Sequence, residues 1–251
     1  MINMRNLAGK YCIVTGAGKG IGKAIAKRFL EEEAAGVAIL EYDYELAKAT
    51  AAELDPTGKK VLAVKCNVAD SDMVKAAVEA VVAAFGRVDV LINNAGITRD
   101  KIFHKMEDDD WYAVVNVNLN GVYNLCKYVV PLMREQESGA IVNLSSTSLM
   151  GNPGQANYAA TKAALQGFTR TMAKELGRKN VRMNCIAPGY IDTDMMRAVG
   201  EEILTRMVKG IPAQRLGDPD EIASIAVFLS TDDSSWVSGQ TIFASGGAIC
   251  N

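Results

Sequence analysis

The sequence predicts an α/β domain with a doubly wound parallel sheet and helices on both faces. Short apolar runs alternate with helical patterns three times within roughly the first 100 residues. This alternation is typical of strand–helix–strand units, whose right-handed crossovers produce a parallel sheet. A glycine-rich turn follows the first apolar run at residues 15–22, and no linker, repeat or low-complexity segment interrupts the pattern. We therefore expect residues 1–251 to form one domain.

Composition narrows the class of protein before any motif is considered. Apolar residues make up 49% of the chain and the net charge is −2, so no charge excess favours a nucleic acid partner. Residues 1–7 contain no apolar signal core, and no apolar run reaches the length needed to span a membrane. The five cysteines include no C-x-x-C pair, and His104 is the one histidine. We therefore expect reduced thiols, no metal site, no membrane contact and a cytoplasmic location.

The first element is a strand at residues 10–14, followed at once by the glycine turn and then by a helix with an apolar stripe. Glycines in this context allow a tight turn and let backbone N–H groups approach a pyrophosphate at the positive end of the helix. The spacing G-x-x-x-G-x-G predicts a dinucleotide site here, and a glycine turn without a ligand is the less favoured interpretation. The contacts predicted from this turn are Gly16, Gly18, Lys19, Gly20, Ile21 and Gly22.

The second strand, at residues 37–40, ends at Glu41. An acidic side chain about 20 residues after the glycine turn can accept hydrogen bonds from the hydroxyls of an adenosine ribose. Its charge also repels a ribose 2′-phosphate, whereas the ammonium of Lys19 would attract one. Because the position of Glu41 follows from the strand end, we expect NAD(H) to be favoured over NADP(H). A solvated loop charge is the alternative interpretation of Glu41.

The following segments repeat the pattern of strand and helix. An alanine-rich helix at residues 46–54 precedes a third strand at residues 61–66, and a helix capped by Ser71 ends at Gly86 before a fourth strand at residues 88–92. The carboxyl ends of parallel strands lie at one edge of the sheet, where ligands bind. We therefore expect one rim to be formed by the residues that follow strands, namely Thr15, Glu41, Asn67, Asn93 and Ser145 or Ser146.

The second half of the chain continues the alternation. One long helix is expected at residues 108–133, with Pro131 bending its last turns and Asn118 as a polar break in its apolar face. That break is typical either of a satisfied core amide or of a functional site. Another helix begins at Pro219, and further strands are expected at residues 140–144, 181–186 and 241–243.

The segment at residues 194–210 is rich in methionine and other long apolar side chains. Such adaptable side chains suit a variable apolar ligand. We expect residues 190–215 to form a flap over a substrate, with an ordinary core-facing helix as the alternative.

Tyr158 and Lys162 lie one helical turn apart on the same face of a predicted helix. A free tyrosine has a pKa near 10 and is a poor acid at neutral pH, and a nearby ammonium lowers that pKa by favouring the phenolate. Ser145 and Ser146 end the strand before this helix, so a hydroxyl and a phenol can meet over one small substrate. Such a spacing also occurs by chance, and the convergence of strand ends favours the catalytic interpretation.

Several motifs, in order along the chain, resemble the short-chain dehydrogenase/reductase family. They are Thr15–Gly22, Asn93–Gly96, Asn118, the serine before Tyr158-x-x-x-Lys162, and Pro188-Gly189. The resemblance covers nearly the whole chain and implies that residues 1–251 form one Rossmann-type domain that both binds a dinucleotide and carries out catalysis. Within the family, residues 94–100 and 154–160 are similar to 3-oxoacyl-acyl-carrier-protein reductases and acetoacetyl-CoA reductases.

The resemblance implies catalytic roles for the matching residues. Tyr158 is the proton donor in reduction or the base in oxidation. Lys162 binds the nicotinamide ribose and lowers the tyrosine pKa, and Asn118 holds a water that links Lys162 to solvent. A serine hydrogen-bonds the substrate oxygen.

The resemblance also implies further contacts with the cofactor. Ile191 and Thr193 hold its carboxamide, and Asn67 stands near adenine where many relatives have aspartate. The other implied contacts are Val68, Asn94, Ala95, Gly96, Pro188 and Gly189, of which Asn94 and Gly96 flank the adenosine side.

Two rules disagree on which serine acts. The family serine is the second of a Ser-Ser pair, which gives Ser146, whereas the usual spacing back from the tyrosine gives Ser145. A one-residue slip moves a strand side chain to the other face of the sheet. Strand registry therefore favours Ser146.

Carrier-protein binding in the similar reductases uses arginines beside the active-site entrance. The matching positions in this chain are Glu137 and Lys179. We therefore expect an acidic carrier protein or a CoA phosphate to bind less well near Glu137.

The activity implied by the resemblance is hydride transfer between NAD(P)(H) and a carbonyl or secondary alcohol. A 3-oxoacyl thioester of acyl carrier protein or CoA is the first candidate substrate. The alternative is an NAD-dependent dehydrogenase of a small secondary alcohol, diol or steroid, which Glu41 and Glu137 favour. A third interpretation is a non-catalytic dinucleotide-binding protein on the same fold. The resemblance also implies a homotetramer, with the helix after Tyr158 and the C-terminal strand at its interfaces.

Overall fold

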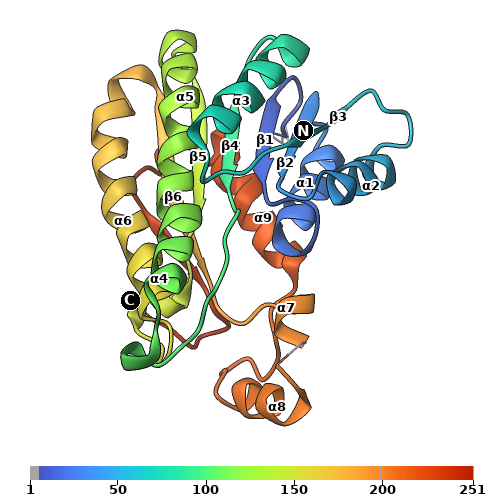
Figure 1. Cartoon of the computed structure of the whole chain (residues 1–251). Coiled ribbons are helices and arrows are strands. Elements are labelled where there is room, and N and C mark those ends of the chain that lie inside the picture. Colours follow the sequence, from blue (N-terminus) through green and yellow to red (C-terminus); the bar gives the residue numbers. More distant parts are fainter. Residues whose placement is uncertain (1–5, 198, 251) are drawn as a thin grey trace.

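The computed structural model describes residues 6–197 and 199–250, and Figure 1 shows them as one sheet with helices on both faces. Within these residues the sheet has seven strands in the order β3-β2-β1-β4-β5-β6-β7, and every neighbouring pair is parallel. The order reverses between β1 and β4, which is the switch point where ligands bind in doubly wound sheets. The predicted fold class is confirmed.

The strands lie where the apolar runs predict them, with ends that differ by one to two residues. They are β1 (Tyr11–Thr15), β2 (Gly36–Glu41), β3 (Val61–Lys65), β4 (Val90–Asn93), β5 (Gly139–Leu144), β6 (Val181–Pro188) and β7 (Thr241–Ala244).

The helices fill the connections between strands. They are α1 (Gly20–Glu31), α2 (Tyr44–Leu54), α3 (Ser71–Phe85), α4 (Asp108–Val115), α5 (Gly121–Gln136), α6 (Ala156–Leu176), α7 (Asp194–Arg197), α8 (Glu201–Lys209) and α9 (Pro219–Ser230). Helix α9 begins at the predicted proline, where Asp218 and Glu221 form a reciprocal capping box.

Two apolar layers cover the two faces of the sheet. Alternate strand residues such as Ile141 and Met183 pack with α3, α5 and α6, while Val142 and Ile186 pack with α1, α2 and α9. Successive side chains of a strand point to opposite faces, so a strand buried on both sides reads as a continuous apolar run. The face covered by α6 also carries buried polar residues, which are important for the site described below.

The expected helix at residues 108–133 forms, and it contains a π-helical turn. Helix α4 ends at Val115, a π-helical turn occupies Asn116–Asn120, and α5 continues from Gly121 with Pro131 inside it. The π-helical turn adds one residue to the helical path, and such turns are frequent at functional sites. It holds Asn118, the polar break in the sequence pattern.

The cap of α3 also differs from the prediction. Asp70, not Ser71, is its N-cap, and the Asp70 carboxylate accepts hydrogen bonds from the backbone N–H groups of Asp72 and Met73. Ser71 is the first helical residue, and its hydroxyl is 3.1 Å from the hydroxyl of Tyr128 on α5. Gly86 ends the helix in the left-handed conformation, as predicted.

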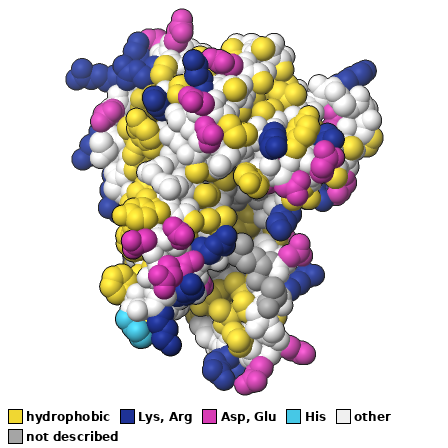
Figure 2. Space-filling model, viewed as in Figure 1, with side chains coloured by type: hydrophobic (Ala, Val, Ile, Leu, Met, Phe, Trp, Pro, Cys, Tyr) yellow, Lys and Arg dark blue, Asp and Glu magenta, His cyan; other side chains and the backbone are white. Residues whose placement is uncertain are grey.

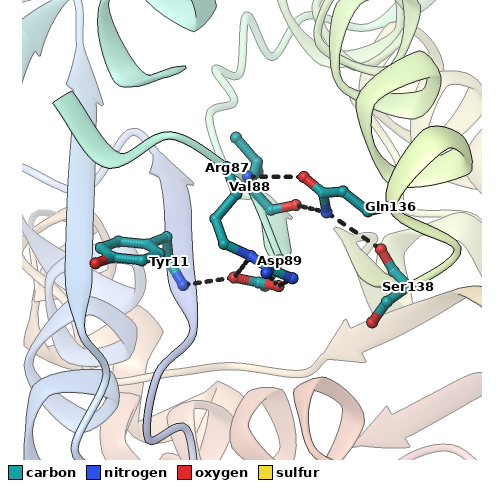
Figure 3. Close-up of polar contacts among 6 residues, drawn as sticks. All are labelled: Tyr11, Arg87, Val88, Asp89, Gln136 and Ser138. Carbon is teal, nitrogen blue, oxygen red and sulfur yellow. Dashed lines mark hydrogen bonds and ion pairs between the residues drawn. The ribbon is translucent and has the colours of Figure 1, made fainter. Parts of the chain in front are cut away.

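Polar contacts tie together the amino edge of the sheet, the end opposite the carboxyl rim (Figure 3). The buried carboxylate of Asp89 accepts from the backbone N–H of Tyr11 and from the guanidinium of Arg87. The Gln136 amide, at the end of α5, bonds both the N–H and the C=O of Val88. Helix α5 therefore ends at the amino edge, just before β5 begins.

The flap segment contains α7 and α8, which lie beyond the carboxyl edge at the bottom of Figure 1. None of the residues of α8, all of which the structure describes, is buried. Leu204, Met207 and Val208 of this helix are half-buried, and the flap stays a prediction. Figure 2 shows hydrophobic side chains on the surface of this lower segment, where Ile203 is exposed. Ala198, within the expected flap, lies outside the described residues.

No helix among the described residues is both long enough and apolar enough to cross a membrane.

Candidate active site

Tyr158 and Lys162 lie in the first two turns of α6, at the carboxyl edge of the sheet. The ammonium nitrogen of Lys162 is buried and donates a hydrogen bond of 2.6 Å to the carbonyl of Leu144, the last residue of β5. The same nitrogen is 5.5 Å from the centroid of the Tyr158 ring. The structure therefore brings together the pair predicted from the i, i+4 spacing.

The two serines that follow β5 point to different partners. The Ser146 hydroxyl lies close enough to the Tyr158 hydroxyl to lower the pKa of Tyr158. As the cap of a short 3₁₀ turn, Ser146 also accepts from the N–H of Ser148. The buried Ser145 hydroxyl instead donates to the backbone carbonyl of Lys162 at 2.7 Å. Ser146 is therefore the serine that faces Tyr158, in agreement with the strand registry that favoured it.

The electrostatics of the pair differ from the expectation. Burial raises the pKa of Tyr158, the hydrogen bond from Ser146 lowers it, and the charge of Asp100 raises it. Burial lowers the pKa of the Lys162 ammonium to about 8. The predicted lowering of the tyrosine pKa by Lys162 is therefore not found in the protein chain, because desolvation of the phenolate dominates and the ammonium donates to Leu144.

Asn118 braces the loop that follows β4. Its side-chain oxygen accepts from the backbone N–H of Ile97 at 2.8 Å, and its amide nitrogen donates to the carbonyl of the same residue at 3.0 Å. A Cβ atom added to Gly96 would lie 3.3 Å from the Asn118 oxygen and 3.5 Å from the Lys162 nitrogen. The loop thus passes close to Lys162 at a position where a side chain has little room.

The glycine turn packs against Asn94 in a way that admits no extra atoms. A Cβ on Gly22 would lie 2.4 Å from the carbonyl oxygen of Gly16 and 2.5 Å from the Asn94 side chain. The Asn94 amide donates to the carbonyls of Thr15 and Gly16, both at 2.9 Å. The Asn94 side chain therefore holds the backbone of the glycine turn by hydrogen bonds. The sequence predicted Asn94 beside adenosine and did not predict this contact.

The N-terminus of α1 suits a pyrophosphate. Lys19 is its N-cap, and the Lys19 side chain accepts no hydrogen bond from the first N–H groups of the helix. Free N–H groups at a helix N-terminus, with the helix dipole, favour an anion. The glycine cradle and these open donors fit the dinucleotide that the sequence predicts.

Both peptide groups that flank the Cα of Gly18 are hydrogen-bonded. Its N–H donates to the Glu41 carboxylate at 3.0 Å, and its carbonyl accepts from the buried hydroxyl of Thr50 at 2.7 Å. Glu41 therefore lies beside the glycine turn, as predicted from the end of β2. The sequence analysis did not identify Thr50. The signal that could have identified it is a hydroxyl side chain within the alanine-rich helix.

The remaining predicted cofactor residues follow β3 and β6 at the same edge. Asn67 accepts from the N–H of Ala69, and the carbonyl of Val68 accepts from the Asn124 amide. Beyond β6, which ends at Pro188, a Cβ on Gly20 of the glycine turn would lie 3.6 Å from the Thr193 methyl group. The loops that carry Gly189, Ile191 and Thr193 therefore meet the glycine turn across the rim.

Glu137 and Lys179 are not beside this rim, so the placement expected for them is wrong within one chain. They form an exposed ion pair of 2.7 Å, which lowers the pKa of the Glu137 carboxyl. Glu137 follows Gln136 at the end of α5, and Gln136 bonds Val88 at the amino edge (Figure 3). Helix α6, of 21 residues and therefore about 30 Å long, separates that edge from Tyr158.

Comparison with known proteins agrees with this geometry. Residues 16–248 match the family model described as enoyl-(acyl carrier protein) reductase. The chain is 45% identical to 3-oxoacyl-(acyl-carrier-protein) reductase FabG of Chlamydia muridarum, over 96% of this chain and 98% of that protein. It is 46% identical to the FabG of Thermotoga maritima, over 97% of this chain and 99% of that protein.

Solved structures are similar over the same length. A putative short-chain alcohol dehydrogenase from Sinorhizobium meliloti has a TM-score of 0.92 at 34% identity, covering 97% of each chain. Levodione reductase has a TM-score of 0.91 at 33% identity, covering 96% of this chain and 98% of its own. The glycine turn, the Tyr158–Lys162 pair and these full-length similarities show that the chain belongs to the short-chain dehydrogenase/reductase family of NAD(P)-dependent oxidoreductases.

Proposed function

We propose that this protein reduces the 3-oxo group of an acyl thioester, carried by acyl carrier protein or CoA, to the 3-hydroxy group. The observation that carries the proposal is the Lys162 ammonium nitrogen 5.5 Å from the Tyr158 ring centroid at the carboxyl edge of the sheet, with the Ser146 hydroxyl beside Tyr158. The names of the FabG relatives, which match this chain over nearly their whole length, support the choice of substrate.

The cofactor, when bound, supplies the hydride or accepts it. Tyr158 gives its proton to the carbonyl oxygen in reduction and takes it back in oxidation. The Ser146 hydroxyl, which lies beside that of Tyr158, hydrogen-bonds the same oxygen. A well-placed general acid contributes on the order of 10²–10⁴-fold to the rate.

Lys162 and Asn118 have supporting roles in this proposal. The ammonium of Lys162 binds the nicotinamide ribose, and Asn118 holds a water that links Lys162 to solvent. The contacts of Asn118 with Ile97 keep the loop after β4 close to the ammonium, which is consistent with that role.

We propose NAD(H) as the preferred cofactor. The Glu41 carboxylate accepts hydrogen bonds from the backbone N–H groups of Gly18 and Tyr42, which hold its negative charge at the end of β2. A charge held there repels a ribose 2′-phosphate and accepts from the 2′-hydroxyl of NAD(H). Lys19, exposed in the glycine turn, is the one feature of that turn that favours NADP(H).

The rest of the predicted dinucleotide site belongs to the same proposal. Its residues are Gly16, Gly18, Gly20, Ile21, Gly22, Asn67, Val68, Asn94, Ala95, Gly96, Pro188, Gly189, Ile191 and Thr193. Their common support is that each follows a strand at the carboxyl edge of the sheet or lies in the glycine turn.

Apolar side chains around the rim support an acyl chain in the substrate. Ile102, Phe103, Met150 and Ile203 are all exposed. They lie in the segments that follow β4, β5 and β6 and thus surround the carboxyl edge. We propose that residues 190–215 close over this chain as a flap.

The alternative substrate is a small secondary alcohol, diol or steroid, and the two solved structures named above favour it by their printed names. Glu137 no longer argues for this alternative, because it lies at the far edge of the same chain. A non-catalytic dinucleotide-binding protein agrees less well with the Ser146–Tyr158 contact.

We also propose a homotetramer with α6 and β7 at its interfaces. Strand β7 is an edge strand of the sheet, and an edge offers unpaired N–H and C=O groups to another chain. Trp236, in the loop just before β7, is 99% exposed, as is expected of a side chain that a second copy covers.

A substrate and cofactor panel tests the proposed function. Acetoacetyl-CoA and a 3-oxoacyl carrier-protein thioester are compared with simple ketones, diols and a steroid ketone, each with NADH and NADPH. We expect the highest kcat/KM for a thioester with NADH. Faster turnover of a simple ketone or diol would support the alternative, and cofactor binding without any turnover would support the non-catalytic interpretation.

A further inference from the structure

Three successive residues at the end of β5 attach the strand to α6. The Asn143 amide donates to the hydroxyl of Thr169 at 2.9 Å. The carbonyl of Leu144 accepts from the Lys162 ammonium at 2.6 Å, and the Ser145 hydroxyl donates to the Lys162 carbonyl at 2.7 Å. All these groups are buried.

These contacts follow from the side-chain periodicity of the strand and of the helix. Asn143 and Ser145 are two residues apart in an extended segment, so their side chains point to the same face. Lys162 and Thr169 are seven residues apart in a helix, which is close to two full turns, so they also share a face. The strand end therefore bonds α6 at two levels separated by about 10 Å along the helix axis.

The contact between Asn143 and Thr169 continues into the core of the sheet through further polar contacts. Asn93 on β4 donates to the Asn143 oxygen at 2.8 Å, and the Thr169 hydroxyl is 3.1 Å from the Cys185 sulfur on β6. Asn93, Asn143 and Cys185 are partners in the register of three neighbouring strands. This buried chain of polar groups fixes Thr169, and through it α6, relative to the strands.

Ser146 is the next residue along the chain, and its hydroxyl lies beside that of Tyr158. The separation between Ser146 and Tyr158 is therefore set by how α6 lies along the end of β5. A shift of reacting groups by about 1 Å can cost on the order of 10²-fold in rate.

We propose that Ser145 and Asn143 are positioning residues, which hold α6 in register with the end of β5 and thereby keep Tyr158 and Lys162 aligned with Ser146. Ser145 acts on the first turns of the helix through the Lys162 carbonyl. Asn143 acts two turns further along through Thr169. This inference rests on the proposed roles of Tyr158 and Ser146.

The test compares Ser145→Ala with a matched control, Ser230→Ala. Ser230 is also buried and also donates to a helix carbonyl, that of Ala226 at 2.6 Å, but it lies on α9 on the opposite face of the sheet. We expect Ser145→Ala to lower kcat by about 10- to 100-fold. Ser230→Ala is expected to lose a similar amount of thermal stability and to keep kcat within about 2-fold.

The pH profile distinguishes positioning from a merely structural role. Loss of the Ser146–Tyr158 alignment removes a hydrogen bond that lowers the tyrosine pKa. The pKa of Tyr158 should therefore rise in Ser145→Ala, and Ser145→Thr, which keeps a hydroxyl, should restore much of kcat. A kcat loss no larger than that of Ser230→Ala, or a loss with an unchanged pH profile, would overturn the proposal.

A second pair of variants covers the case in which Ser145→Ala does not fold. Thr169→Val removes the hydroxyl that bonds Asn143, and Thr169→Ser retains it. The expected result is a lower kcat and a raised Tyr158 pKa in Thr169→Val only. Equal behaviour of the two variants would overturn the role of Asn143.

The Tyr158 pKa can be measured without turnover from the absorbance of the phenolate during a pH titration. The contribution of Tyr158 is the absorbance of each protein minus that of the same protein carrying Tyr158→Phe. Failure of the proposed function appears as wild-type protein that does not turn over 3-oxoacyl thioesters. Failure of this inference appears as Ser145→Ala with an unshifted Tyr158 absorbance titration.

Discussion

The carboxylate of Glu41 accepts a hydrogen bond from the backbone N–H of Gly18 at 3.0 Å, which ties the end of β2 to the glycine turn. Glu41 therefore has two roles in the proposed site. It places a negative charge where the adenosine ribose is expected, and it holds the N–H of Gly18, whose carbonyl accepts from Thr50.

Two substitutions of Glu41 separate these functions. Glu41→Gln keeps an acceptor for Gly18 but removes the charge, so we expect NADPH to gain roughly tenfold in kcat/KM relative to NADH. Glu41→Ala removes both, so we expect weaker binding of both cofactors. Dissociation constants from cofactor fluorescence check this, and an unchanged preference in Glu41→Gln would contradict the assignment.

Thr50 should contribute to cofactor affinity although it lies beneath the glycine turn. Thr50→Val removes the hydroxyl that donates to Gly18 and leaves a buried carbonyl unpaired, which costs about 1–3 kcal/mol. We expect the cofactor dissociation constant to rise about tenfold while the KM of the carbonyl substrate changes little. Thr50→Ser is the matched control and should bind the cofactor nearly as the wild type does.

Tyr158→Phe removes the proposed proton donor without changing the shape of the ring. We expect kcat to fall by about 10²–10⁴-fold, while the dissociation constant for NADH stays within a few-fold of wild type. Near-normal turnover in this variant would mean that another group protonates the carbonyl.

Ser146→Ala and Ser146→Thr test the serine that faces Tyr158. The alanine variant loses a hydrogen bond to the substrate oxygen and a bond that lowers the tyrosine pKa. We expect kcat to fall by about 10²-fold and the pH profile to shift upward. The threonine variant retains the hydroxyl and should keep much of the activity. If both variants were equally impaired, lost space rather than the lost hydroxyl would explain the result.

Burial of Lys162 predicts a pH dependence of stability. Its pKa is about 8 in the folded chain against 10.5 for the ordinary side chain, so between these values the unfolded chain binds more protons. Stability contributed through Lys162 should therefore rise as pH increases from about 8 to about 10.5, by on the order of 3 kcal/mol.

The comparison protein for this measurement is Lys162→Met. Raised pKa values of Tyr158 and of Cys66 act in the opposite direction at high pH in both proteins. The Lys162 charge also lowers the pKa of Cys185, so both proteins are compared in a Cys185→Ala background. The free energy of unfolding of wild type minus that of Lys162→Met, measured in denaturant at pH 8 and pH 10, should increase. A constant difference would show that the ammonium is not desolvated.

The sequence alone determined the fold and the place of the site. Strand and helix patterns are local, because apolar periodicity depends on neighbours within one or two turns. Crossovers between parallel strands place the carboxyl ends of all strands at one edge, which brings Thr15, Glu41, Asn93 and Ser146 there. The i, i+4 spacing likewise placed Tyr158 beside Lys162 without any knowledge of the rest.

Only the tertiary structure decided the contacts between distant segments. Ser145 and Ser146 are chemically identical, and their different partners are visible only when α6 is packed on β5. The support of Gly18 by Thr50 joins residues 32 apart in sequence, and no local pattern encodes that contact.

Two expectations were wrong for the same kind of reason. Glu137 lies at the amino edge because α5 runs from one edge of the sheet to the other. The pKa of Tyr158 is raised because packing removes water from its hydroxyl, and spacing along one helix does not report solvent exclusion by other segments. Local periodicity specifies which elements form, whereas packing between elements sets how each polar side chain is paired and how far it is desolvated.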